Sequence, residues 1–300
     1  MNAGSIVKAQ REFFSTGKTR EISFRRRQLE ALKDAVSGYA SRIVRALKED
    51  MGKPAFEAYV AEISQVNTSI DYTLRRLACW SRPGRVHTPA YLFLASSHVM
   101  PEPVGVALVI GPWNYPMDLV IEPLIGAIAA GNCAVLKPSE IAPATSAVVC
   151  SMISETFAPA FVKAVEGGAE ETQALLEEKF DYIFYTGGTA VGRIVMQKAA
   201  EQLTPVTLEL GGKSPCIVEP DIDLEVAARR ITWGKFFNAG QTCIAPDYLL
   251  VNAEVKGPLL EAIEACTRKF YGGDPMSSPD FARIVSDKHF QRVSALMTEG

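Results

Sequence analysis

The sequence predicts an α/β fold in which a doubly wound parallel sheet is followed by a second, incomplete α/β unit. Two observations carry this prediction. Residues 104–203 alternate short apolar stretches with stretches of ten or more residues that have helical character. Strands separated by helices of that length pair in parallel, with both faces of the sheet covered. The chain has 300 residues, of which 48% are hydrophobic and 22% charged, so it is long enough for two globular domains.

The first quarter of the chain is predicted to be helical. Apolar residues recur at steps of three to five over 24–51, which places them on one face of a helix. Gly52 and Pro54 end that pattern, and a second helix is expected to reach about Cys79. Residues 82–103 are rich in Pro, Ser and aromatic residues. They are expected to form an extended arm or hairpin, either as a subunit contact or as a plain linker.

The alternation of strand and helix defines the predicted boundary between the two units. Expected strands lie in VGVALVIG, CAVLKP, FVKAVEGG and DYIFYTGG, each followed by a helix. We predict that residues 1–207 form the first unit, which includes the arm at 82–103, and that residues 208–300 form a partial second unit. The second unit begins near TPVTLELGGKSPCIVEP, where two strands are expected, and continues with a helix at 223–238, a strand in YLLVN and a helix at 256–271.

Composition excludes several classes of partner. The net charge is −3, so there is no basic surface for nucleic acid. Six cysteines without a CxxC pair or a disulfide framework indicate a reducing compartment, and we expect a cytoplasmic protein. No signal peptide and no apolar run of roughly 18 residues is found. The three histidines are scattered, so no metal site is expected.

Two motifs follow expected strands and could contact a ligand. TGGTAVGR, with Gly187, Gly188 and Gly192, opens a helix where free N–H groups favour phosphate, although it is neither GxGxxG nor a Walker loop. KPSE ends a strand with Lys137, and its Glu140 suits ribose hydroxyls and opposes a 2′-phosphate. The alternative for this pair is a surface lysine and a helix cap.

Three further residues could take part in a reaction. Asn114 in GPWNYP follows a strand and is either an amide donor to the same region or a turn residue. Glu209, beside a glycine pair, is either solvated or a general base whose pKa burial would raise. Cys243 in FFNAGQTCIAP is either a small buried hydrophobe or a nucleophile. The other five cysteines lie in apolar patterns and are expected to be inert packing residues.

These motifs together resemble one family. GPWNYP, KPSE, TGG.AVGR, LELGGKSP and FFNAGQTC, in this order and spacing, are similar to the NAD(P)-dependent aldehyde dehydrogenases, and the short N-terminus resembles their class 3 branch. The resemblance implies a Rossmann-like cofactor domain in residues 1–207 and part of a catalytic domain in residues 208–300. It implies oxidation of a small-molecule aldehyde to a carboxylic acid through a cysteine thiohemiacetal and thioester. NAD is the implied cofactor, with NADP as the alternative, and a homodimer is the implied assembly.

The resemblance also implies a role for each candidate residue. Cys243 is the nucleophile, Glu209 the general base, and Asn114 forms the oxyanion hole with the Cys243 backbone N–H. Lys137 and Glu140 bind the adenosine ribose. The residues implied beside the pyrophosphate are Gly187, Gly188, Thr189 and Gly192.

Two alternatives remain open. A cysteine acyl-transfer enzyme would use Cys243 without redox chemistry. It would require a histidine partner for the cysteine, and no histidine lies in these motifs. A truncated fragment or pseudoenzyme would bind dinucleotide or a partner subunit. The family's downstream E.FGP motif has no match before Gly300. We therefore expect the family's C-terminal part to be missing and the 300-residue chain to turn over aldehyde weakly.

Overall fold

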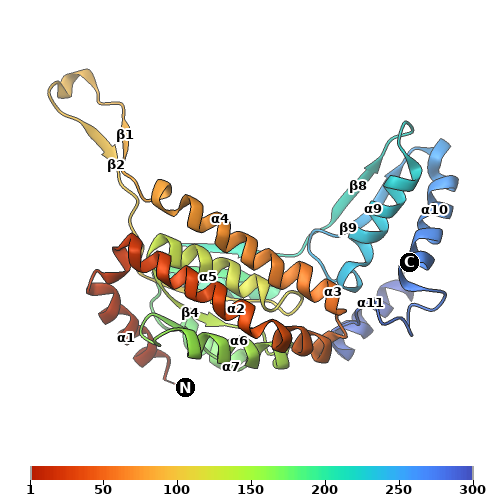
Figure 1. Cartoon of the computed structure of the whole chain (residues 1–300), viewed down its shortest axis with the longest axis horizontal. Coiled ribbons are helices and arrows are strands. Elements are labelled where there is room, and N and C mark those ends of the chain that lie inside the picture. Colours follow the sequence, from red (N-terminus) through yellow and green to blue (C-terminus); the bar gives the residue numbers. More distant parts are fainter. Residues whose placement is uncertain (1, 299–300) are drawn as a thin grey trace.

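A five-stranded parallel sheet between layers of helices forms the main body of the molecule (Figure 1). The computed structural model describes residues 2–298. The strand order is β5-β4-β3-β6-β7, and every neighbouring pair is parallel. The predicted fold class is therefore confirmed. The strands are β3 (Val106–Ile110), β4 (Cys133–Lys137), β5 (Val162–Ala164), β6 (Tyr182–Thr186) and β7 (Val206–Glu209).

The helices divide between the two faces because the chain reverses direction across the sheet. It runs from β3 through β4 to the edge strand β5, and then crosses back to β6 and β7. Crossovers between parallel strands are right-handed, so a reversal moves the connecting helices to the other face. One face carries α5 and α6 beneath α2 and α4, and the other carries α8 with α7 and α1 beside it. These helices are α1 (Ala3–Ser15), α2 (Ile22–Met51), α4 (Gln65–Trp80), α5 (Asp118–Ala130), α6 (Pro143–Thr156), α7 (Ala169–Leu176) and α8 (Thr189–Glu201).

Local sequence accounts for the position of α5. Strands β3 and β4 are buried along their whole length, as their continuous apolar runs indicate. Between them α5 ends at Gly131, whose φ of 90° lies in the left-handed region. A Cβ at Gly131 would lie 2.7 Å from Nη2 of Arg25, so the close approach of that side chain also requires glycine.

The N-terminal helices agree with the prediction except at one segment. The helix expected over 24–51 is α2, and it ends at Gly52 with a φ of 61°. The second helix is interrupted. It begins as α3 (Ala55–Ala58), passes through a π-helical segment at Tyr59–Ser64, and continues as α4. The sequence pattern did not predict this π-helical segment, which carries a buried glutamate, Glu62.

The segment 82–103 forms a hairpin that projects from the body (Figure 1). Strands β1 (Gly84–Val86) and β2 (Ser97–Val99) pair antiparallel, with Gly84 opposite Val99. The tip is apolar and exposed, since Tyr91, Phe93 and Leu94 keep 84%, 84% and 92% of their surface accessible. The predicted hairpin is therefore confirmed, and its role stays a prediction.

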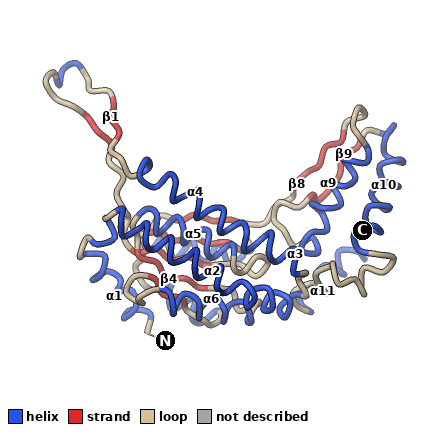
Figure 2. Tube along the Cα trace, viewed as in Figure 1, coloured by secondary structure: helices blue, strands red, loops and turns tan. Residues whose placement is uncertain are grey.

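A smaller α/β unit lies at the opposite end of the molecule (Figure 2). Parallel strands β8 (Ser214–Val218) and β9 (Pro246–Val251) pack with α9 (Leu224–Phe236) and α10 (Ala253–Tyr271) around a separate small core. A last helix, α11 (Asp287–Thr298), was not predicted. Of the two strands expected in this unit from TPVTLELGGKSPCIVEP, the first is β7, which pairs with β6 instead. The predicted boundary at 207 falls inside β7, and we propose that the first unit runs to Glu209.

Candidate active site

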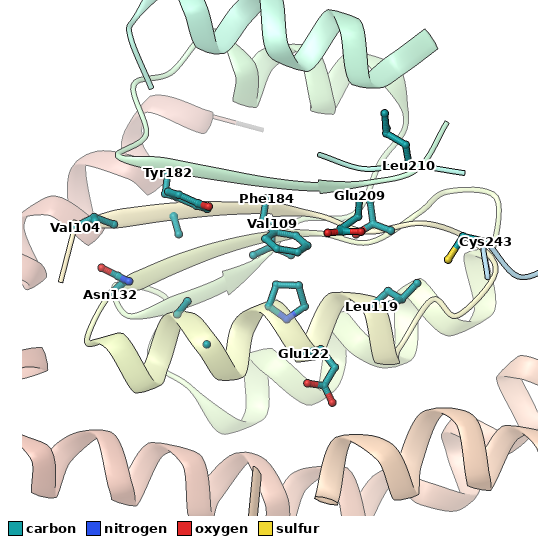
Figure 3. A pocket seen from close by; sticks show the side chains of 15 residues that line it. Val104, Val109, Leu119, Glu122, Asn132, Tyr182, Phe184, Glu209, Leu210 and Cys243 are labelled. Atoms are coloured by element: carbon teal, nitrogen blue, oxygen red, sulfur yellow. The ribbon is translucent and has the colours of Figure 1, made fainter. Parts of the chain in front are cut away.

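The candidate site lies where β3 and β6 end side by side at the carboxyl edge of the sheet. The chain leaves β3 toward α5 on one face and β6 toward α8 on the other. Such a switch point is where doubly wound sheets bind ligands. A mostly apolar cavity of about 640 Å³ lies between one face of the sheet and α5, and it runs from the amino ends of β3 and β6, at Val104 and Tyr182, to this edge (Figure 3). Leu119 of α5, Phe184 of β6, Glu209 and Cys243 line this cavity.

Cys243 is presented by a sharp turn after α9. Asn238 and Ala239 have φ angles of 54° and 53°, and Gly240 follows with 75°, so three consecutive residues lie in the left-handed region. The Cys243 side chain is exposed and lines the cavity. Its carbonyl oxygen packs against Gly212, where a Cβ would lie only 2.3 Å away. Gly212 therefore lets the cysteine loop approach the chain just after β7 closely.

Asn114 connects the loop after β3 to the cysteine loop. Its side-chain Nδ2 donates to the carbonyl oxygen of Gln241 at 3.0 Å. Its own carbonyl oxygen accepts from Asn238 Nδ2 at 2.9 Å and from Lys53 Nζ at 3.0 Å. The neighbouring Tyr115 hydroxyl lies 2.6 Å from Thr242 Oγ1. The structure therefore holds Asn114 against the loop that carries Cys243.

Three charged side chains are buried beneath these loops: Lys53, Glu57 and Glu62. The sequence analysis did not identify any of them. Lys53 Nζ lies 2.5 Å from Glu62 Oε1, and both side chains are fully buried. Glu57 Oε2 accepts from the backbone N–H of Asn238 at 2.9 Å. Burial raises the pKa of Glu57 to about 7, although the Asn238 hydrogen bond and the Lys53 charge oppose that rise.

Glu209 is the last residue of β7, and its carboxylate faces the same cavity as the Cys243 sulfur (Figure 3). Its carbonyl oxygen accepts from the backbone N–H of Gly187 at 2.9 Å. The side chain is exposed. Glu209 therefore stands within reach of solvent water at the wall that carries the cysteine.

The candidate cofactor residues lie along the same edge of the sheet. Lys137 ends β4 and is 1% exposed; its Nζ donates to the Pro138 carbonyl at 2.8 Å and lies 3.4 Å from Glu140 Oε2. The Glu140 side chain is half exposed. The surface-lysine alternative for Lys137 is therefore wrong. The residues expected at a pyrophosphate, Gly187, Gly188, Thr189 and Gly192, form the turn from β6 into α8.

That turn has the geometry of an open helix N-terminus. Gly188 is the N-cap of α8, and no side chain caps the helix. A Cβ at Gly187 would lie 2.3 Å from Oη of Tyr185, and a Cβ at Gly192 would lie 2.9 Å from Leu210 Cδ2. Side chains at Gly187 and Gly192 are thus excluded by close packing. The N–H groups of the first turn of α8 are left available to an anion.

The other cysteines divide into two groups. Cys133 is buried and Cys150 partly buried, and burial raises the pKa of each thiol to about 12, which fits the expected packing role. Cys79 is exposed, so the expectation of a packing role is wrong for it. Within residues 2–298, no group of three or more His, Cys, Asp or Glu side chains could hold a metal ion. No helix in that range is long and apolar enough to cross a membrane.

Comparison with known proteins gives close matches over the whole chain. The chain is 49% identical over 285 residues to the 4,4′-diaponeurosporen-aldehyde dehydrogenase of Staphylococcus aureus, covering 95% of this chain and 62% of that protein. It is 46% identical over 296 residues to the dimeric NADP-preferring aldehyde dehydrogenase of Mus musculus, covering 99% and 65%. The chain thus spans less than two thirds of the length of these curated relatives.

A solved structure and a family model agree with these matches. The substrate-bound state of Staphylococcus aureus AldH superposes with a TM-score of 0.94 at 47% identity, covering 98% of this chain and 64% of that one. The model of the aldehyde dehydrogenase family matches residues 1–300. The family match over residues 1–300, the identity to curated relatives and the superposition lead to one conclusion: this chain belongs to the aldehyde dehydrogenase family.

Proposed function

We propose that the full-length protein carrying this chain oxidises aldehydes to carboxylic acids with NAD or NADP. The observation that carries the proposal is that two candidate groups line one cavity and the third is hydrogen-bonded to the cysteine loop. Cys243 and Glu209 line the cavity, and Asn114 is hydrogen-bonded to Gln241, two residues before the cysteine. A nucleophile, a candidate base and an amide donor are the groups that oxidation through a covalent intermediate needs.

The first step is addition of the Cys243 thiolate to the aldehyde carbon. Addition pushes the carbonyl electron pair onto oxygen and produces an alkoxide, which is a thiohemiacetal anion. The Asn114 amide has two N–H donors, and only one is used by the Gln241 carbonyl. The second N–H, with the Cys243 backbone N–H, is the proposed donor set for the alkoxide. One such donor contributes about 3 to 4 kcal/mol in comparable sites.

The later step is hydrolysis of the thioester on Cys243. Glu209 removes a proton from a water molecule, and the resulting oxygen attacks the thioester carbon. The C–S bond then breaks, the carboxylic acid leaves and the thiolate is restored. The exposure of Glu209 at the cavity supports this role, because a base that activates water needs access to it.

The residues at the carboxyl edge fit a dinucleotide. A bound nicotinamide cofactor would supply the hydride acceptor between addition and hydrolysis. The uncapped α8 terminus, with no room for side chains at Gly187 and Gly192, suits a pyrophosphate. Thr189 and Gly188 stand in the same turn. At the end of β4, which β3 separates from β6, the Lys137–Glu140 pair is proposed to bind the adenosine ribose.

The cavity and the hairpin support proposals for the substrate and the assembly. The mostly apolar wall, with Leu119 and Phe184, favours aldehydes with an apolar aliphatic or aromatic body. The name of the Staphylococcus aureus relative, which includes a diaponeurosporen aldehyde, agrees with that preference. The exposed apolar hairpin tip supports homodimer formation, and the mouse relative is named dimeric. Sedimentation velocity of the Phe93→Ser variant tests this, since an unchanged dimer would exclude the tip as a contact.

The proposed reaction is tested by following NADH or NADPH absorbance with the full-length protein and an apolar aldehyde. Cys243→Ala should abolish cofactor reduction and leave cofactor binding intact. Residual oxidation in that variant would overturn the nucleophile assignment. Thioester or ester hydrolysis by the wild type, without any cofactor reduction, would instead favour a cysteine acyl-transfer enzyme.

A further inference from the structure

The most deeply buried charges of the described chain lie under the candidate oxyanion donor. Lys53 follows α2 directly, and Glu62 lies in the π-helical segment. Their charged groups are 2.5 Å apart and both side chains have 0% exposure. Lys53 Nζ also lies 4.3 Å from the centre of the Tyr115 ring. Because both side chains are fully buried, neither residue is placed to touch substrate.

Both members of the pair contact the loop that carries Asn114. Lys53 Nζ donates to the Asn114 carbonyl oxygen at 3.0 Å. Glu62 Oε2 accepts from the backbone N–H groups of Met117 at 2.9 Å and Asp118 at 3.3 Å, at the start of α5. The loop from β3 to α5 is therefore held at its asparagine and at its far end by one ion pair.

The two buried carboxylates come from neighbouring helical segments. Glu57 lies in α3, and Glu62 lies five residues later in the π-helical segment. Glu57 contacts the backbone N–H of Asn238 on the cysteine loop, while Glu62 contacts the loop after β3. Lys53 lies between the two carboxylates and interacts with both.

A stabilising role alone explains this arrangement poorly. A fully buried ion pair is a weak source of stability, because removal of both charges from water offsets most of their attraction. The ion pair does fix the orientation of the loop, since each charge is hydrogen-bonded to a specific donor or acceptor of the loop. Preorganised donors are what an oxyanion site requires.

We propose that Lys53 and Glu62 are positioning residues for the oxyanion hole, fixing the main chain of Asn114 so that its free amide N–H meets the alkoxide. This inference rests on the proposed function and deepens it. The pair acts through Asn114 alone, so its contribution to turnover disappears when Asn114 has no amide. A residue that merely stabilises the fold would lack that dependence.

The test is a double-mutant cycle on the full-length protein. Lys53→Met with Glu62→Gln removes both charges together, which leaves no uncompensated buried charge and keeps an acceptor for the Met117 N–H. This paired variant should lower kcat by roughly 10- to 100-fold, as misplacement of a reacting group by about 1 Å does. KM for the cofactor should change less than about twofold. Asn114→Ala should lower kcat by roughly 100- to 1,000-fold, the usual loss for one oxyanion donor.

The decisive measurement is the paired variant in the Asn114→Ala background. A further fall in kcat of less than about twofold supports the proposal, because groups that act as a unit are not additive. A full further 10- to 100-fold fall overturns it. Lys33→Met is the matched control, since it breaks a Lys–Asp pair of the same 2.5 Å length on the surface between α2 and α4. Leu29→Ala, a fully buried core change, controls for lost stability.

A second readout does not depend on activity. Hydrogen–deuterium exchange should accelerate in residues 113–118 of the paired variant and stay unchanged in β4. Unchanged exchange in that loop would overturn the positioning role even if kcat fell. A wild-type protein that oxidises no aldehyde would overturn the proposed function instead, while the exchange result would still decide whether the pair holds the loop.

Discussion

The two sides of the candidate site differ in how firmly the fold holds them. On one side the Asn114 carbonyl accepts two hydrogen bonds, one of them from a fully buried lysine. On the other side Cys243 and Glu209 expose their side chains to the cavity, and within residues 2–298 no hydrogen bond holds either reactive group. The group that must stabilise charge is fixed in advance, whereas the groups that must meet substrate and water stay accessible.

The largest effect that can test this difference is expected on the exposed side. Glu209→Gln should lower steady turnover by roughly 100-fold, because a positioned general base contributes about 10²- to 10⁴-fold. The loss should fall on thioester hydrolysis more than on acylation. A pre-steady-state burst of NADH should therefore remain while steady turnover falls. If the burst and the steady rate fell together, a different group would be the base.

An intermediate effect is expected on the buried side and concerns stability. Glu57 binds its proton more tightly in the folded state, since burial raises its pKa from 4.5 to about 7. Protonated Glu57 therefore raises the free energy of unfolding below about pH 4.5, and this stabilisation is lost progressively as the pH rises to about 7. Charged and titratable groups facing Glu57 are Lys53, Asp280, Tyr115 and Tyr271.

Glu57→Gln should remove the loss of stability that Glu57 causes as the pH rises to about 7, and it keeps an acceptor for the Asn238 N–H. At pH 8 the variant should be more stable than wild type by up to about 3 kcal/mol, at about 1.4 kcal/mol per pKa unit. Urea unfolding from pH 5 to pH 8 measures the difference. Glu49→Gln, at an exposed glutamate of α2, is the matched control and should change nothing. Equal pH dependence in wild type and Glu57→Gln would mean that Glu57 does not titrate in this range.

The smallest effect is expected at Glu140, which is half exposed beside the buried Lys137. Glu140→Gln removes a charge that opposes a 2′-phosphate, so NADP binding should tighten relative to NAD. Exposed charges contribute about 1 kcal/mol or less, which corresponds to roughly a fivefold change in the ratio of the dissociation constants. Titration of both cofactors measures that ratio. A wild type that already prefers NADP would show that the carboxylate does not control the choice.

Much of the fold could be predicted because its signals are local. The continuous apolar runs of β3 and β4 and the left-handed stop at Gly131 each follow from neighbouring residues. The assignment of β7 failed because the residues of a strand do not say which neighbour it pairs with. Its partner β6 is set by the reversal of the chain across the sheet.

The reactive residues of the site could be predicted, and the residues that hold them could not. Cys243, Glu209 and Asn114 stand in motifs rich in glycine, proline and asparagine that mark strand ends and turns. Lys53 and Glu62 look like ordinary surface residues of a helix boundary, because a buried lysine and an exposed one leave the same local pattern. Only the packing of α5 against the π-helical segment shows that they are buried.

The π-helical segment also limits how the length of this region can change. A π turn holds one residue more than the α turn that could replace it. Deleting one of residues 59–64 would therefore let a regular α-helix form, and the turns on either side would stay in phase. Deleting Glu62 itself would remove the carboxylate that pairs with Lys53 and accepts from the Met117 N–H. The exposed hairpin tip at 90–95 should accept insertions and deletions, whereas this buried turn should accept at most the loss of one residue other than Glu62.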